Sequence, residues 1–177
     1  MDGLVTFSLP IQGLGDGIHE YRFEIDASFF SHFENSPIAK GDIEVFLTLD
    51  KRPSMMVLDF DFSGTIRTEC DRCLAEIDLP VDGTPQLVVK FSEEEEPEDA
   101  EVIFIHPEAE SLQVARFIYE FVVLSIPIIR VYDCELDEPR VCNLDMLSML
   151  EKAEEPEPDP ENENPVWDAL KKFKDNS

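Results

Sequence analysis

Four cysteines are the residues of this 177-residue chain whose type and spacing could support chemistry. Cys70 and Cys73 are separated by two residues, and Cys134 and Cys142 follow later in the chain. A Cys-x-x-Cys pair has the spacing of one half of a tetrahedral zinc site, and a second pair would complete a set of thiolate ligands. Cys70, Cys73, Cys134 and Cys142 are therefore the candidate metal ligands and zinc is the candidate cofactor, provided that the fold brings both pairs together.

Two other interpretations of these cysteines compete with zinc binding. A redox-active Cys-x-x-Cys normally lies at a helix N-terminus after a strand, where the thiolate is stabilised. This motif lies between two predicted strands beside Glu69, Asp71 and Glu76, whose carboxylates oppose formation of a thiolate. The interpretation that the sequence favours most is that the thiols are buried or half-buried turn residues that hold no metal.

No other catalytic motif accompanies the cysteines. His19, His32 and His106 fall in separate segments and do not have the spacing of metal ligands. The sequence contains no Gly-x-Ser-x-Gly, His-Glu-x-x-His or Walker-type motif. We therefore expect a binding or assembly protein rather than an enzyme.

The charge of the chain restricts the classes of partner that it can bind. The 14 Lys and Arg residues are outnumbered by 40 Asp and Glu residues, which gives a formal net charge of −26. Proteins that grip nucleic acids or anionic membranes need clustered positive charge, so the composition disfavours direct binding to either. A basic protein is the natural electrostatic complement, and the alternative is that the charge only confers solubility.

The sequence also predicts where the protein resides. No basic segment of the kind that opens a secretory signal follows Met1. The most apolar stretch, residues 112–132, is interrupted by Arg116, Glu120, Pro127 and Arg130, and this favours a buried helix over a membrane span. We expect a cytoplasmic protein, in which cysteines are more often thiols or metal ligands than disulfides.

Hydrophobic periodicity predicts an α+β domain over residues 1–152. Apolar residues alternate with polar ones in many short segments of the first two thirds of the chain, which indicates strands with one buried face. Turn residues between them favour antiparallel hairpins and a barrel-like sheet with a central packed helix. The strands are predicted at residues 5–9, 21–25, 43–49, 56–62, 66–70, 77–81, 87–91 and 102–105. The helices are predicted at 26–33, 112–125 and 143–152, with Asp26, Ser111 and Asn143 as their N-caps.

The C-terminal part follows an acidic linker. Residues 153–163 are rich in Glu and Pro, which predicts a disordered linker, and residues 164–177 are predicted to hold a terminal helix and tail. Asn at the cap and Pro at the first position are strong signals for a helix start. The helix would dock either on its own domain or on a partner. The candidate partner-binding residues are Asn164, Pro165, Trp167, Leu170 and Phe173.

The order of these features resembles the YceD family, the large ribosomal RNA subunit accumulation proteins. The resemblance runs from about Ser28 onward. It depends on the Cys-Asp-Arg-Cys-Leu turn at 70–74, the Leu-Ser-Ile-Pro-Ile segment at 124–128, Cys-Asn-Leu-Asp-Met at 142–146 and Asn-Pro-Val-Trp-Asp-Ala-Leu-Lys-Lys at 164–172. Cys70 and Cys73 match the family's Cys-x-x-Cys. Val166 and Trp167 stand where relatives often have Phe, so the terminal anchor is shifted.

The resemblance implies a non-enzymatic factor in ribosome biogenesis that supports accumulation of large-subunit (23S) rRNA. It also suggests a basic large-subunit ribosomal protein as the partner, because such a protein is often encoded next to family members. The acidic segments 93–99 and 154–163 would then mimic RNA phosphates, with Trp167, Leu170 and Phe173 as an apolar anchor. The alternatives are a zinc-stabilised protein-interaction module unrelated to ribosomes and a thiol oxidoreductase.

Overall fold

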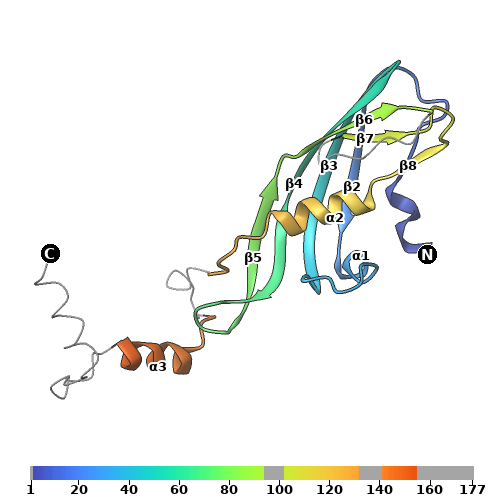
Figure 1. The fold of residues 1–177 in the computed structure, drawn as a ribbon. Coiled ribbons are helices and arrows are strands. Elements are labelled where there is room, and N and C mark those ends of the chain that lie inside the picture. Colours follow the sequence, from blue (N-terminus) through green and yellow to red (C-terminus); the bar gives the residue numbers. More distant parts are fainter. Residues whose placement is uncertain (1, 94–101, 132–140, 155–177) are drawn as a thin grey trace, which may run out of the picture.

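The computed structural model describes residues 2–93, 102–131 and 141–154. Residues 153 and 154, predicted to begin the acidic linker, are the end of a helix. The rest of that linker, the terminal helix at 164–177 and most of the acidic loop at 93–99 lie outside the described residues. The predicted boundary at residue 152 therefore remains a prediction. The described part combines a large sheet with a few short helices, which confirms the α+β class (Figure 1).

The main sheet is built on one long antiparallel hairpin and has six strands in the order β2-β3-β4-β6-β7, with β5 also paired to β4. All pairings within it are antiparallel except that of β6 with β7, which is parallel. Strands β2 and β7 are the edges, so the sheet is open and the barrel-like detail of the prediction is wrong (Figure 1). The strands are β2 Gly17–Ile25, β3 Lys40–Arg52, β4 Met55–Glu69, β5 Glu76–Gly83, β6 Gln86–Phe91 and β7 Val102–Ile105.

Strand β4 is paired along both of its edges. On one edge it pairs with β3 over its whole length. On the other edge β5 and β6 follow it in one continuous register, with Phe62 opposite Gly83 and Asp59 opposite Gln86. Between these pairs the amide of Phe60 donates to the carbonyl of Pro85 at 2.9 Å. β5 and β6 therefore act as a single strand with a bend.

The remaining elements cover one face of this sheet. Helix α2 runs across that face, and a small antiparallel pair of β1 with β8 lies near its end (Figure 1). A buried Phe cluster joins these elements to the strands, with ring centroids of Phe7 and Phe23 5.3 Å apart and those of Phe7 and Phe29 4.9 Å apart. The covering elements are η1 Asp2–Phe7, β1 Ser8–Pro10, α1 Ala27–Phe30, β8 Ser111–Gln113 and α2 Ala115–Leu124, and α3 Leu144–Glu154 follows them.

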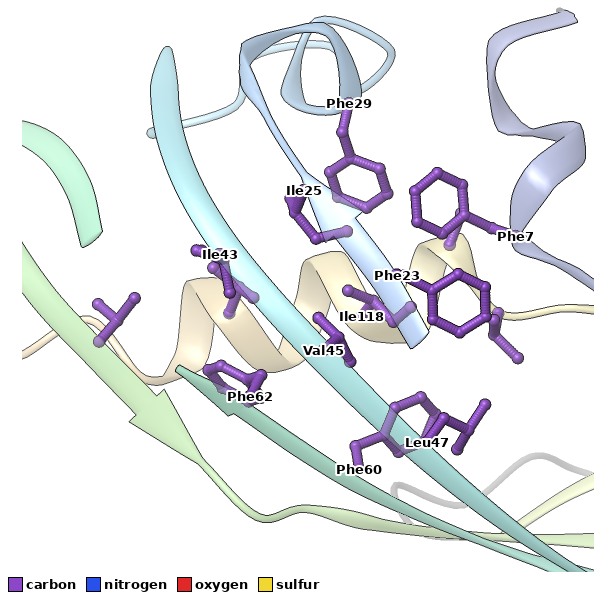
Figure 2. Packing of buried hydrophobic residues seen from close by; sticks show 14 of the residues in the cluster. Phe7, Phe23, Ile25, Phe29, Ile43, Val45, Leu47, Phe60, Phe62 and Ile118 are labelled. Atoms are coloured by element: carbon purple, nitrogen blue, oxygen red, sulfur yellow. The ribbon is translucent and has the colours of Figure 1, made fainter. Parts of the chain in front are cut away.

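The period of two in the strands fixes which side chains form the core. Val45 and Leu47 of β3 are 0% and 1% exposed, and Ile118 of α2, at 1%, packs in the same cluster (Figure 2). The intervening side chains of the same strands face solvent. The sheet therefore has one face under α2 and a second face that none of the described helices covers.

Most predicted elements are confirmed. The two strands predicted at 56–62 and 66–70 are one continuous strand, β4, and two further exceptions are informative. Asp26 caps α1 as expected, because its carboxylate accepts hydrogen bonds from the amides of Ser28 and Phe29 at 2.8 and 3.2 Å. Asn143 caps α3 through the amide of Met146 at 3.3 Å.

The first exception is the segment predicted as a strand at 5–9. Residues up to Phe7 form a 3₁₀ helix, and only Ser8–Pro10 is a strand. The second exception is Ser111, predicted to cap a helix from 112. Ser111–Gln113 instead pairs with β1, so α2 begins at Ala115 and Val114 is its cap without a side-chain hydrogen bond. Pairing with a segment about 100 residues earlier overrides the local helix signal.

Strand β4 gives a test of this packing at Gly64. A Cβ on Gly64 would overlap the backbone of β3, lying 2.6 Å from the Cα of Ile43. We expect Gly64→Ala to lower the free energy of unfolding by about 1–3 kcal/mol, as overpacking does in well-packed cores. Urea denaturation of the wild type and of Gly64→Ala measures this difference in the free energy of unfolding. Gly15→Ala is the matched control, because no atom lies within 4 Å of its Cβ position. Equal midpoints for both variants would contradict the close approach.

Candidate functional site

The Cys-x-x-Cys motif forms the turn between β4 and β5. The amide of Cys70 donates to the carbonyl of Ala75, and the amide of Leu74 donates to the carbonyl of Cys70, both at 2.9 Å. Leu74 has a φ of 58°, a left-handed conformation that is uncommon for a branched residue, and its side chain is 51% exposed. The two thiols are buried, at 2% and 1% exposed for Cys70 and Cys73. The motif thus turns its sulfurs into the core and presents Leu74 to solvent.

A group of polar side chains ties this turn to the segment that follows α2. The guanidinium of Arg130 donates to Asp71 Oδ1 at 2.8 Å, and the Arg130 amide donates to Asp71 Oδ2 at 2.7 Å. The amide of Asp71 donates back to the Arg130 carbonyl at 2.8 Å, and Arg130 Nη1 lies 3.2 Å from Thr68 Oγ1. We call Thr68, Asp71 and Arg130 the clasp. Hydrogen bonds from Arg130 lower the pKa of the Asp71 carboxyl.

Large apolar side chains are exposed around the clasp. Ile128 is 100% exposed, Ile129 is 70% exposed and Leu124, at the end of α2, is 80% exposed. Ile128 and Ile129 belong to the short connection after α2 that the clasp holds against the β4–β5 turn, and this turn carries exposed Leu74. Exposed apolar groups of this kind occur at surfaces that bind other proteins. The arrangement suits binding rather than catalysis.

The four predicted metal ligands are only partly placed by the structure. Neither Cys70 nor Cys73 is in a disulfide, and Cys134 lies outside the described residues. Cys142 is buried, at 9% exposed, and is disulfide-bonded, so the expectation of thiols rather than disulfides is wrong for this residue. A cysteine in a disulfide offers no thiolate to a metal, so a four-thiolate zinc site would require that bond to be reduced. Zinc and its ligand set remain predictions.

Within the described ranges, no group of three or more His, Cys, Asp or Glu side chains is placed to hold a metal ion. None of the helices in those ranges is long and apolar enough to cross a membrane. The predicted partner-binding residues Asn164, Pro165, Trp167, Leu170 and Phe173 lie outside the described part of the chain.

Sequence reasoning missed two functional features. It treated Arg130 only as a charge that interrupts an apolar stretch, because Asp71 is 59 residues away and no local pattern links them. It also passed over Phe46, which is 50% exposed although its strand neighbours are buried. A signal for Phe46 was present, since it is an aromatic residue at a position where the alternation of β3 calls for a polar one.

A comparison with protein families identifies the chain. The family model for "Large ribosomal RNA subunit accumulation protein YceD" matches residues 58–174, which is more than half of the sequence. The chain belongs to the YceD family. The matched YceD region begins within β4 and includes the Cys-x-x-Cys turn, α2, the clasp and α3. The YceD family is named for an accumulation factor and not for an enzyme. No curated protein and no solved structure showed significant similarity to the chain.

The lowered pKa of Asp71 makes a prediction about stability and pH. Because the pKa is lower in the folded state, the clasp stabilises the protein above the unfolded value of about 4, and this stabilisation is lost as the pH falls through the folded pKa. We expect Asp71→Asn to lower the urea midpoint near pH 7 and the difference from the wild type to shrink at acidic pH. Asp50→Asn, which removes a local pair with Arg52, is the control and should change the midpoint little. A difference for Asp71→Asn that is independent of pH would contradict the ionic role of the clasp.

The buried turn makes a prediction about the thiols. We expect iodoacetamide to label Cys70 and Cys73 far more slowly in the native reduced protein than in urea, because both sulfurs are covered by the core. Mass spectrometry of peptides measures the labelling of each residue. A chelator distinguishes burial from zinc binding as the cause of slow labelling. Thiols that are protected by burial stay unlabelled when the chelator is added, whereas thiols that are protected by zinc become labelled. Rapid labelling of Cys73 in the native protein would contradict the buried turn and favour a redox role.

Proposed function

We propose that this YceD-family protein supports accumulation of large-subunit rRNA as a non-enzymatic assembly factor. The observation that carries the proposal is the match of the family model across residues 58–174. The described residues support a binding role, because the motif cysteines are buried in a turn and the exposed side chains form apolar and acidic surfaces. The proposed place of action is the cytoplasm.

We further propose that the partner is a basic large-subunit ribosomal protein. The support is electrostatic, since a chain with a net charge of −26 repels RNA phosphates and attracts Lys- and Arg-rich proteins. Without rRNA, a basic ribosomal protein binds other anionic molecules non-specifically. An acidic binding protein would keep the ribosomal protein soluble until rRNA displaces it. Loss of the acidic binding protein would then lower assembly of the large subunit and expose its rRNA to degradation.

Depletion of the protein in its own cells tests this function. We expect the ratio of large-subunit to small-subunit rRNA to fall, and sucrose gradients to show fewer complete large subunits. A copy of the wild-type gene should restore both. A copy carrying Cys70→Ala and Cys73→Ala should restore them as well when it accumulates to the same level, because the proposed role uses no thiol chemistry. An unchanged rRNA ratio after depletion would overturn the proposal. Failure of a well-expressed double variant would favour the thiol oxidoreductase.

A further inference from the structure

The face of the sheet turned away from α2 carries an unusual combination of side chains. In β2, β3 and β4 the outward positions alternate with the core positions, and we call six of them the open face. They lie side by side in the register, with Arg22 opposite Phe46 and Phe46 opposite Asp61 in one row. In the next row Glu20 is opposite Thr48 and Thr48 is opposite Asp59. The open face consists of Glu20, Arg22, Glu44, Phe46, Asp59 and Asp61.

Phe46 is the apolar centre of the open face. Its side chain is 50% exposed, whereas Val45 and Leu47 on either side are 0% and 1% exposed. A large aromatic ring on the solvent side of a sheet does not contribute to the core, and its burial by a partner would be favourable. The Cζ atom of Arg22 lies 5.8 Å from the ring centroid, so the ring already contacts one guanidinium. Aromatic faces attract such cations.

Three of the four carboxylates of the open face, Glu20, Asp59 and Asp61, are not neutralised within the described part of the chain. Arg22 forms ion pairs with Glu24, at 3.7 Å, and with Glu44, so its charge is already used. Asp59 accepts a hydrogen bond from the neutral amide of Gln86 at 2.6 Å, which leaves its charge in place. None of the ion pairs in the described residues joins Glu20, Asp59 or Asp61 to a Lys or Arg. Asp59 and Asp61 lie two residues apart on the same face of β4, so their like charges repel, and a cation placed between them would relieve the repulsion.

We propose that the open face is the docking surface for a basic protein segment. Its Arg or Lys side chains bind Glu20, Asp59 and Asp61, and one Arg stacks on Phe46 beside Arg22. Arginine suits both contacts, because its planar guanidinium stacks on aromatic rings and pairs with carboxylates through two hydrogen bonds. The charge of the surface selects a basic partner and excludes RNA. The identity of that partner as a ribosomal protein rests on the proposed function, but the surface does not.

Binding of a labelled Arg- and Lys-rich peptide to the full chain tests the proposal. We expect fluorescence anisotropy to show saturable binding that weakens with salt. Asp59→Asn with Asp61→Asn should weaken it by roughly three- to tenfold, the effect expected for two exposed ion pairs. The matched control is Glu108→Gln with Glu110→Gln, which changes the net charge equally at exposed positions away from the sheet. Urea midpoints check that all variants are folded.

A second comparison tests the aromatic contact. Phe46→Ala should weaken peptide binding by roughly threefold or more, and the loss should persist at high salt because it is not ionic. Met149→Ala is its control, since Met149 is a large apolar residue that is 62% exposed in α3 and not on the open face. Equal losses for the sheet pair and the control pair would mean attraction by net charge alone and would overturn the proposal. Binding of a single-stranded RNA oligonucleotide to the open face would overturn it as well.

The outcomes also separate this proposal from the proposed function. If depletion lowers large-subunit rRNA but the wild type does not bind the basic peptide, the open face is not the docking surface and the family role stands. If the peptide binds through Asp59, Asp61 and Phe46 but depletion leaves rRNA unchanged, the surface stands and the ribosomal role fails.

Discussion

Pairing of β4 along both edges is the constraint on which the rest of this structure depends. The strand is contacted by β3 on one side and by β5 and β6 on the other, so a shift of its register by one residue would turn the side chains of every neighbour to the wrong face. Gly64 allows β3 to approach at one point where a side chain could not fit. The core under α2 and the exposed row through Phe46 both follow from this single register.

The clasp and the open face differ in how their charged side chains are paired. At the clasp, Asp71 and Arg130 satisfy each other fully and fix the chain after α2. On the open face, no Lys or Arg of the described ranges pairs with Asp61, and Phe46 is half exposed to water. A protein uses a paired charge to position a segment and an unpaired one to attract a partner, so the two groups have different roles in spite of their similar composition.

The sequence predicted local features well and long-range ones poorly. Alternation along β3 and β4 and the cap at Asp26 were sufficient to predict a mostly antiparallel sheet with short helices, and the Cys-x-x-Cys turn was placed correctly between two strands. Closure into a barrel was not decided by any local pattern, because alternation fixes the faces of a strand and not the number of its neighbours. Pairing of Leu9 with Leu112, and of Asp71 with Arg130, depends on residues far apart in the chain. Those contacts moved the start of α2 and created the clasp.

The position of Arg130 in the chain also sets the order in which the protein can be completed during its own synthesis. Strands β2, β3 and β4 are antiparallel neighbours in sequence order, and β5 and β6 both pair with β4, so each of them can join the sheet as it leaves the ribosome. The turn at Cys70 to Leu74 emerges early, but the residue that secures it is translated 59 residues after Asp71. Until then the clasp is absent, and the β4–β5 hairpin is held by its own contacts, which include its backbone pairing and the ion pair of Arg67 with Asp78. The clasp can therefore form only late in the synthesis of the chain, at the end where α2 is joined to the sheet.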